Sequence, residues 1–390
     1  MLAITAKFFN YTIVGAGASG LWLAYTMLKN QLLEDKTLCI VESDSKKVND
    51  RTWCYWAEKP ISPIEMHSKE WDFIINSSFA ENSEKLFPYK YYHIRSNDFY
   101  LSMKQALSSC KNVHWIYDEV IETKETETSV QVRTSRDSWN SDRIFSSSFI
   151  NKINPIQKSK NELWIWQSFH GWRVKTSKVI FNDSHMSMMN FNVFQGNNTQ
   201  FIYELPFSGT EALVEITRFG VEKITKEEAE KELQKWMKAK NTDFEIIEFE
   251  SGNIPMTTAF DAQPKKISYN ERIIYIGTPS GAIKPTTGYG FKKMQEYAEK
   301  ICLALKNNNQ IPSSLRKSRF RLYDTLLLQI LISKPQKGKL IFTTLFKNQP
   351  IQRVLKFLDE KTTITEEILI FSKLPIKLFM NSLFTYIIKK

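Results

Sequence analysis

The stretch that decides the fold is FNYTIVGAGASG, residues 9–20. Its first half is a short apolar run, which is typical of a buried strand, and its second half is the glycine pattern GxGxxG. Residues 21–33, LWLAYTMLKNQLL, predict a helix, and TLCIV at 37–41 predicts a second strand that ends at Glu42. A strand, a glycine turn, a helix, a strand and an acidic residue in this order predict a βαβ unit that binds a dinucleotide.

Each residue type in this pattern has a physical role in a Rossmann-like unit. Gly15 permits the tight turn, Gly17 lets a pyrophosphate approach the backbone, and Gly20 lets helix and strand pack closely. The helix N-terminus offers free N–H groups and the positive end of its dipole to phosphates. Glu42 is placed to accept a hydrogen bond from a ribose hydroxyl, and the following Ser43 favours FAD or NAD over NADP. The alternative is a glycine-rich turn without a ligand.

Segments further along the chain favour FAD over NAD. Residues 95–107 predict an amphipathic helix, and strands are expected at 113–120, 128–134 and 143–150. Far downstream, residues 272–305 repeat the plan of strand, glycine loop and helix. An NAD dehydrogenase would not usually need a second nucleotide-contacting loop. We therefore expect a flavin domain that is assembled from separated stretches.

Six blocks of the sequence occur in the order that is typical of one protein family, over roughly residues 10–300. They are GAGASGLWLA with Glu42, DRTWCYW (50–56), WQSFHGW (166–172), YELPFSGTEALVEIT (203–217), IPMT (254–257) and IGTPSGAIKPTTGYGF (276–291). On these blocks the chain resembles the bacterial lycopene cyclase family of FAD-dependent proteins. The C-terminal residues resemble that family only in being helical, apolar and rich in lysine.

The resemblance implies a function and a set of site residues. The function is that of a lycopene β-cyclase, which closes the linear ends of lycopene into β-ionone rings, giving β-carotene through γ-carotene, without net redox change. The implied cofactor is FAD, active in its reduced form, with NAD(P)H as the reductant. The implied cofactor-binding residues are Gly15, Gly17, Gly20, Glu42, Arg51, Arg95, Gly277, Pro285, Gly288 and Gly290.

Glu215 is the expected catalytic acid or base. It lies in the segment ALVEITRF, where alternation places Leu213, Glu215 and Thr217 on one face of a strand. In an apolar pocket the pKa of its carboxyl group should rise, so that the group stays protonated and can act as a donor. The family often carries two adjacent acids here, but Ile216 follows Glu215. Glu204 on the preceding strand is therefore the alternative acid.

The expected fold class is α/β. We predict a Rossmann-like FAD-binding domain formed by residues 1–155 and 253–305, an inserted mixed-sheet substrate domain at 156–252, and a helical C-terminal region at 306–390. The chain contains 26 Phe, 15 Tyr and 10 Trp, a load that suits a large apolar pocket for a polyene.

Composition limits the partners and the compartment. Four scattered cysteines form no metal-binding spacing and favour a reducing, cytoplasmic compartment, and we expect no metal. The net charge of +11 comes without a nucleic-acid-binding motif, so no nucleic acid is expected. No apolar run is long enough to span a membrane, but lysines alternate with apolar clusters in the C-terminal third. We expect peripheral attachment to the inner face of the membrane; an ordinary solvated surface is the alternative.

Two other functions are compatible with the same scaffold. One is a redox flavoenzyme, a monooxygenase or desaturase, that acts on a carotenoid or another apolar substrate. The other is a carotenoid-binding protein without catalysis, which the intact glycine pattern, Glu42 and Glu215 disfavour. The position of one base decides between β, γ and ε rings, and at this stage closure of one end and closure of both ends are both open.

Overall fold

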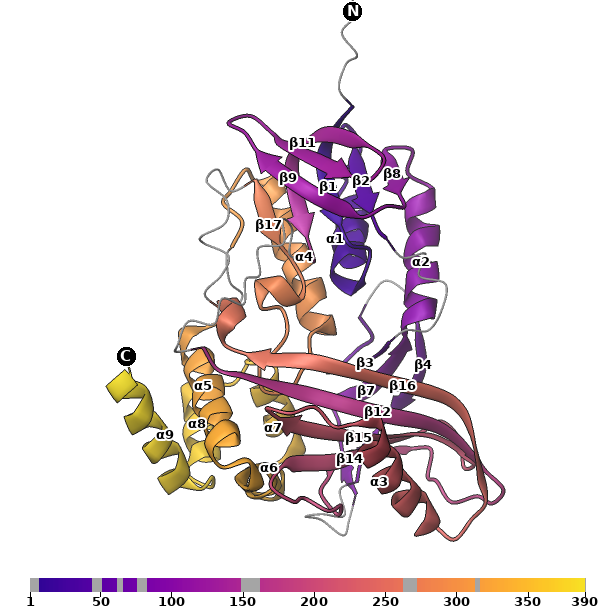
Figure 1. The fold of residues 1–390 in the computed structure, drawn as a ribbon, viewed down its shortest axis with the longest axis vertical. Coiled ribbons are helices and arrows are strands. Elements are labelled where there is room, and N and C mark those ends of the chain that lie inside the picture. Colours follow the sequence, from indigo (N-terminus) through magenta and orange to yellow (C-terminus); the bar gives the residue numbers. More distant parts are fainter. Residues whose placement is uncertain are drawn as a thin grey trace, which may run out of the picture.

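The computed structural model describes residues 7–43, 51–61, 66–75, 83–148, 162–261, 272–312 and 316–389. Within these residues the chain forms three β-sheets and nine α-helices. One sheet with its helices occupies the upper part of the molecule in Figure 1, the long strands of a second sheet cross the lower part, and the C-terminal helices lie beside that second sheet.

The first sheet has the strand order β8-β2-β1-β11-β10-β9, and β17 pairs with β11. The strands β8, β2, β1, β11 and β17 are parallel to one another, whereas β10 and β9 are antiparallel. The strand bounds are β1 (Phe8–Val14), β2 (Leu38–Val41), β8 (Val113–Ile116), β9 (Val120–Glu125), β10 (Val130–Thr134), β11 (Ser138–Ser146) and β17 (Ile273–Tyr275). The predicted βαβ unit and the return of the 272–305 segment to this sheet are therefore confirmed.

Three helices cover one side of this sheet. The first, α1 (Ala18–Lys29), is buried along almost its whole length and packs against α2 (Ser96–Ser108) and α4 (Phe291–Lys306). The indole of Trp22 on α1 contacts the rings of Phe99 on α2 and Phe291 on α4. These aromatic contacts join helices that are far apart in the sequence, so the glycine turn before α1 is held on a rigid base.

The second sheet is mixed and has the order β16-β12-β15-β14-β13-β5-β6. Its bounds are β5 (Phe73–Ile74), β6 (Glu84–Lys85), β12 (Trp164–Thr176), β13 (His185–Asn190), β14 (Thr199–Pro206), β15 (Glu211–Gly220) and β16 (Phe244–Thr257). On one face, Val214 and Ile216 share an apolar core with Leu233 of α3 (Lys226–Lys238). On the other face, Phe201 and Phe219 pack on C-terminal helices.

The third sheet is small and lies between the other two layers. Its order is β3-β7-β4, with bounds β3 (Thr52–Ala57), β4 (His67–Trp71) and β7 (Lys90–Arg95). On β3, Trp53 and Tyr55 pack with the core around α1, whereas Cys54 and Trp56 belong to the core of the large sheet. Side chains from this strand therefore reach both the core around α1 and the core of the large sheet.

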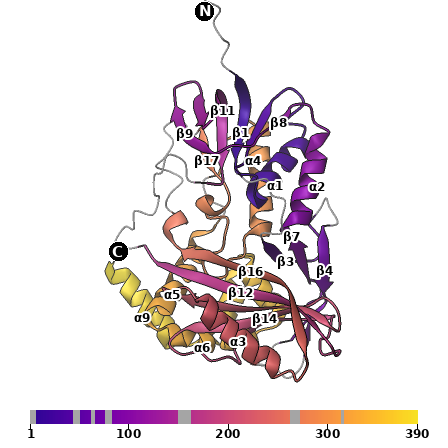
Figure 2. The same ribbon diagram turned by 45° about the vertical axis from the view of Figure 1, so that its right-hand side comes forward.

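The C-terminal region is helical, as predicted. It contains α5 (Ser318–Ser333), α6 (Gly338–Lys347), α7 (Ile351–Leu358), α8 (Ile364–Phe371) and α9 (Ile376–Lys389). Figure 2 shows α9 at the outer edge of the molecule, next to α5. Among the described residues, none of these helices alone has the length and apolar composition of a membrane span. Together α8 and α9 have both, but their axes are bent by 114°.

The predicted domain boundaries stay a prediction. The boundary at 155/156 lies outside the described residues, and the strand β16 runs across the boundary at 252/253. The short strands β5 and β6 come from the predicted flavin domain but pair into the large sheet. A division of the chain into continuous segments therefore does not coincide with the division into sheets.

Candidate active site

The glycine turn between β1 and α1 forms one end of a cleft. Gly15 has a φ of +96°, and a Cβ on Gly20 would lie 2.0 Å from the carbonyl oxygen of Gly15. Both positions therefore require glycine. A Cβ on Gly17 would meet no atom within 4 Å, because this residue faces a cavity of about 390 Å³. The turn is thus shaped to leave room above Gly17.

Glu42 lies at the end of β2 on the wall of the same cavity. Its side chain is buried, and its Oε2 atom accepts a hydrogen bond of 2.7 Å from the backbone N–H of Ala16. Gly277 and Thr278 from the second glycine loop complete the wall. The structure therefore brings the predicted residues of the first and second glycine loops to one cleft.

The second loop, residues 277–290, runs from this cleft into a larger cavity. Gly288 has a φ of +72°, and its N–H donates to the carbonyl oxygen of Lys284 at 3.0 Å. Gly288 and Gly290 line the larger cavity, and Pro285 is buried beside them. Backbone geometry at the predicted glycines therefore shapes the wall of the cavity.

The larger cavity has a volume of about 520 Å³. It shares Arg51, Trp53, Thr278 and Met294 with the glycine cleft, so the two spaces adjoin. Its apolar wall comes from the large sheet and from α6 and α7, and includes Phe169, Phe201, Phe219, Phe342, Phe346 and Leu358. A long apolar molecule can be enclosed here next to a ligand in the cleft.

Two carboxyl groups face the larger cavity from the large sheet. Glu215 of β15 and Glu250 of β16 are both register partners of Gly171 on β12, the strand that lies between β15 and β16. Directly opposite residues of antiparallel strands project to the same face, so both side chains rise above Gly171. A Cβ on Gly171 would lie 2.9 Å from Cγ of Glu250. The absence of a side chain at Gly171 therefore lets the two carboxyl groups meet across the strand.

The two carboxyl groups are hydrogen-bonded to each other. Thr217 Oγ1 donates to Glu215 Oε1 at 2.7 Å, and Thr52 Oγ1 donates to Glu250 Oε2 at 2.7 Å. Both groups keep some accessible surface because they line the cavity, although protein surrounds them. Within the described residues, neither forms an ion pair, so the two groups share one environment without a counter-charge.

Burial determines the protonation of this pair. Burial raises the pKa of Glu215 well above its ordinary value, and the neighbouring charge of Glu250 raises it further. Burial also raises the pKa of Glu250, whereas its hydrogen bonds with Thr52 and Glu215 act in the opposite direction. Burial therefore favours the protonated form of both groups, and the pair is suited to share a proton.

Three tyrosines lie beside the pair. Tyr203 is the register partner of Glu215 on β14. The hydroxyl of Tyr91 is hydrogen-bonded to that of Tyr203 and, at 2.8 Å, to that of Tyr289. Burial raises the pKa of Tyr91 and Tyr289, so both phenols are neutral. Electron-rich neutral rings therefore lie next to the carboxyl pair.

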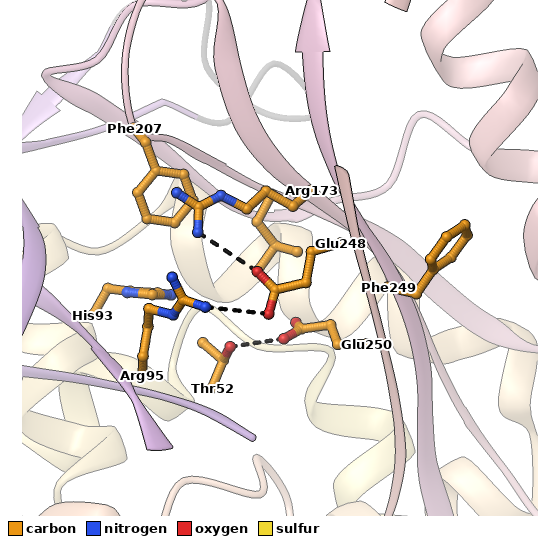
Figure 3. A pocket seen from close by; sticks show the side chains of 9 residues that line it. Thr52, His93, Arg95, Arg173, Phe207, Glu248, Phe249 and Glu250 are labelled. Atoms are coloured by element: carbon orange, nitrogen blue, oxygen red, sulfur yellow. Dashed lines mark hydrogen bonds and ion pairs between the residues drawn. The ribbon is translucent and has the colours of Figure 1, made fainter. Parts of the chain in front are cut away.

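Two of the residues named from the sequence lie outside the cavity and the glycine cleft: Glu204, the alternative acid, and Arg95, an expected cofactor-binding residue. Glu204 is adjacent to Tyr203 on β14, so its side chain projects to the opposite face of the sheet, where its carboxylate contacts Lys240 at 2.8 Å. The alternative acid is therefore outside the cavity. Arg95 lies 3.5 Å from Glu248 in a small separate pocket (Figure 3), and not in the glycine cleft. Arg51 does lie where the cleft and the cavity adjoin.

Sequence reasoning missed Glu250. Glutamate alternates with apolar residues in FEIIEFESGN, residues 244–253, which is typical of a half-exposed edge strand. Nothing in that pattern separates Glu250 from Glu245 or Glu248. Only the pairing of β16 with β12 places Glu250 opposite Gly171.

The cleft and the cavity have features that fit a flavin dinucleotide. The space above Gly17 suits a pyrophosphate at the N-terminus of α1. Gln167 Oε1 is buried without a hydrogen-bond partner in the described part of the chain, and lies 2.6 Å from the position of a Cβ on Gly288. A polar ring edge near Gly288 would satisfy this orphaned acceptor. Within the described residues, no group of three or more His, Cys, Asp or Glu side chains is placed to hold a metal ion.

Comparisons with known proteins identify the fold and the family. A family model described as "Lycopene cyclase protein" matches residues 11–384. The comparison with curated proteins found no match.

Solved structures resemble the chain over nearly its whole length. A geranylgeranyl bacteriochlorophyll reductase-like protein from Thermoplasma acidophilum has 10% identity and a TM-score of 0.58, with 96% of this chain and 98% of that chain covered. The p-nitrophenol 4-monooxygenase PnpA from Pseudomonas putida DLL-E4 has 13% identity and a TM-score of 0.57, with 97% and 98% covered. CtdE in complex with FAD has 12% identity and a TM-score of 0.53, with 87% and 90% covered. The fold is that of the FAD-dependent oxidoreductases, with mixed sheets and C-terminal helices.

Proposed function

The chain belongs to the lycopene cyclase family, and we propose that it is a lycopene β-cyclase. It closes the linear ends of lycopene, or of a related linear carotene, into β-ionone rings, and thereby gives β-carotene through γ-carotene. The observation that carries this proposal is the proton-sharing pair of Glu215 and Glu250 on the wall of a large, mainly apolar cavity.

Ring closure is an acid–base reaction without net redox change. A proton adds to the terminal double bond, a tertiary cation forms, the neighbouring double bond attacks it, and a proton leaves the new ring. Glu215 donates the first proton, because burial and the neighbouring Glu250 raise its pKa and favour its protonated form. The Glu250 carboxylate accepts the second proton. Transfer back along the hydrogen bond between the two groups restores the starting state, so protons balance over each closure.

The wall of the cavity protects the cations. Aromatic rings stabilise a nearby positive charge through their π-faces, and Tyr203, Tyr289 and Phe219 all line this cavity. The apolar side chains of α6 and α7 exclude water, which would otherwise capture the cation as an alcohol. The pocket therefore supplies both a proton and a dry, electron-rich surface.

We propose that FAD is held along the adjoining cleft. Gly15, Gly17 and Gly20 with the N-terminus of α1 would hold the pyrophosphate, and Glu42 the ribose. Arg51 would add positive charge where the cleft adjoins the cavity. The backbone around Gly288 and Gly290 would bind the ring edge. Reduced FAD, kept reduced by NAD(P)H, would supply negative charge beside the developing cation.

The cofactor assignment is tested with Gly17→Val. Because the space beside Gly17 contains no protein atom within 4 Å, the variant should fold, yet its branched side chain would occupy the place of the pyrophosphate. Purified protein should have lost its yellow flavin absorbance while its circular dichroism spectrum is unchanged. Full flavin content in the variant would show that the pyrophosphate lies elsewhere.

We also propose peripheral attachment to the inner, cytoplasmic face of the membrane, where a carotene substrate dissolves. Large apolar side chains that are more than half exposed occur along α8 and α9: Ile364, Ile368, Ile376, Met380, Phe384, Ile387 and Ile388. Lys373 and Lys377 are exposed beside them and suit anionic headgroups. Carbonate washing should release at least part of the protein from membranes. Complete retention would mean that the protein inserts more deeply.

Expression in a host that accumulates lycopene tests the function directly. A cyclase gives ringed products whose mass equals that of lycopene, which chromatography with mass spectrometry detects. A monooxygenase or desaturase on the same fold would change the mass, and a binding protein would leave lycopene unaltered. Formation of the ringed product without oxygen would separate the cyclase from the redox alternatives.

A further inference from the structure

Glu250 lies between two cavities. Together with Thr52 and Leu213, it lines the large cavity and also a small pocket on its other side, which we call the outer pocket. The outer pocket is bounded by the large sheet and the small sheet, and its other polar residues are His93, Arg95, Arg173 and Glu248 (Figure 3). The acceptor of the carboxyl pair therefore has a second, polar side that ring closure does not use.

Polar residues of the outer pocket lie opposite one another on paired strands. Thr52 of β3 is paired with Arg95 of β7, and Arg173 of β12 is paired with Glu248 of β16. Glu248 contacts Arg95 at 3.5 Å and Arg173 at 3.6 Å, and in Figure 3 both guanidinium groups point towards it. The side chains of Arg95 and Glu248 are 36% and 32% exposed. This side of the pocket therefore reaches solvent.

We propose that the outer pocket is a proton-exchange gate, in which a water molecule and the Thr52 hydroxyl connect Glu250 to solvent. The pocket volume of about 20 Å³ is sufficient for one water. Thr52, Glu248 and the two arginines are the polar partners that such a water needs. The route runs from solvent to this water, to Thr52, to Glu250 and to Glu215.

Thr52 is suited to this step because a hydroxyl both donates and accepts. It donates to Glu250 Oε2 at 2.7 Å, and its lone pairs can accept from water. His93 is the competing carrier, but burial and the nearby Arg173 and Arg95 lower its pKa to about 3. The neutral imidazole is also bound through Nδ1 to Ser68 Oγ at 2.6 Å. The hydroxyl, and not the imidazole, therefore carries the proton.

The gate rests on the proposed function but is not needed for closing a ring. Glu215 loses one proton and Glu250 gains one, and transfer between them restores the pair without solvent. Passage through Thr52 exchanges a proton on the pair for a solvent proton, with no net gain or loss. The gate therefore determines whether the hydrogen given to each new ring comes from solvent or returns from the preceding substrate.

Ring closure in D₂O tests the gate. The wild-type product should carry about one deuterium per closed ring, because each closure takes its proton from an exchanged pair. Thr52→Val removes the hydroxyl at nearly constant shape, and the deuterium per ring should fall by at least about twofold because the abstracted proton is reused. Thr52→Ser should restore the wild-type label. Glu245→Gln, which changes an exposed carboxylate on β16, the strand of Glu250, should not change the label.

A second readout does not depend on catalysis. The C=O stretch of the protonated carboxyl group in the resting, flavin-loaded protein shifts after transfer to D₂O, and this shift should be slower in Thr52→Val than in Thr52→Ser. Glu248→Gln, at a side chain that is 32% exposed, should also slow the shift of the C=O stretch. This variant replaces Thr52→Val if Thr52→Val does not fold. If wild-type protein closes no ring, the proposed function fails, while the infrared exchange still tests the gate. Unchanged labelling and unchanged exchange in the variants would overturn the gate, because protons would then enter through the large cavity.

Discussion

Two pairs of carboxyl groups lie near the 277–290 loop, one buried in contact with it and one on the wall of the cavity that it also lines, and their surroundings differ. Asp324 and Glu360 are met by Lys284, Lys293 and Arg316, with Lys284 Nζ at 2.8 Å from Asp324 and 3.3 Å from Glu360. The pair of Glu215 and Glu250 has hydroxyl donors and no ion pair among the described residues. The same chemical group is therefore buried with and without compensating charge.

The pKa values separate the two pairs. Burial alone would raise the pKa of Glu360, but Lys284, Lys293 and Arg316 hold it well below its ordinary value. The pKa of Glu215 is instead raised by burial and by Glu250. The lowered pKa favours the ionised form of Glu360, and the first cluster is a clamp that holds the loop through Lys284 and Thr286. The raised pKa favours a protonated Glu215, which is what the proposed acid of ring closure requires.

The largest expected effect is on the reactive pair. Glu215→Gln keeps the shape and hydrogen-bonding capacity of the side chain but removes the proton. We expect it to fold, to bind FAD and to accumulate uncyclised lycopene, with a rate loss of about 10²–10⁴-fold. Chromatographic rate assays on purified enzyme measure this loss. Normal cyclisation would mean that the proton comes from elsewhere.

Substitution of a cation in the clamp should lower the stability of the protein. Lys284→Met removes one cation from a cluster whose side chains are 2–14% exposed, and leaves buried carboxylates with less compensation. We expect a loss of ~3–5 kcal/mol in the free energy of unfolding, measured by denaturant titration.

Lys361→Met is the matched control for the clamp, because Lys361 pairs with Glu296 at the surface, with side chains 51% and 34% exposed. It should cost less than ~1 kcal/mol. Equal losses in Lys284→Met and Lys361→Met would show that the buried cluster is not a clamp.

The two pairs should also give opposite pH dependence of stability. A lowered pKa, as at Glu360, contributes stability above the ordinary value of 4.5, and this is lost as pH falls towards the folded-state pKa. A raised pKa, as at Glu215, means that the folded state binds the proton more tightly, so stability falls as pH rises above 4.5. Glu215→Gln should therefore lose less stability than wild type as the pH rises above 4.5, by about 1.4 kcal/mol for each unit by which the folded-state pKa of Glu215 exceeds that value. Parallel curves in denaturant titrations would contradict the raised pKa.

The smallest effect is expected at Glu204. Its carboxylate contacts Lys240 and the indole N–H of Trp236 on the far face of the sheet. Glu204→Gln should therefore change the rate of cyclisation by less than about threefold and stability by ~1 kcal/mol at most. If Glu204→Gln abolished cyclisation and Glu215→Gln did not, the wrong face of the sheet would have been assigned to the reaction.

The parts of the site that were predictable are local in sequence. The glycine pattern, Glu42 and the 277–290 loop follow from turn and strand signals that each span a few residues. Alternation on β15 places Glu215 and Thr217 on one face, and the resemblance to a known family marks Glu215 as the acid. These predictions needed no knowledge of which strands pair.

The parts that were not predictable depend on register. Glu250 becomes the partner of Glu215 only because both are opposite Gly171, which is 44 residues from one and 79 from the other by their numbers. A shift of one residue would turn Glu250 to the other face of the sheet. The same limit applies to Glu204, which alternation alone could not place relative to Glu215, and to Arg95, which pairs with Glu248 on a distant strand.

Infrared spectroscopy of the resting, flavin-loaded protein at pH 7 tests the central claim most directly. The account predicts a C=O band from a buried, protonated carboxyl group in the wild type, because burial and Glu250 raise the pKa of Glu215. That band should be changed in Glu215→Gln, where only Glu250 remains to hold the proton, and unchanged in Glu204→Gln. A wild-type spectrum with carboxylate bands alone, and no difference from Glu215→Gln in the protonated region, would contradict a proton-sharing pair as the acid of ring closure.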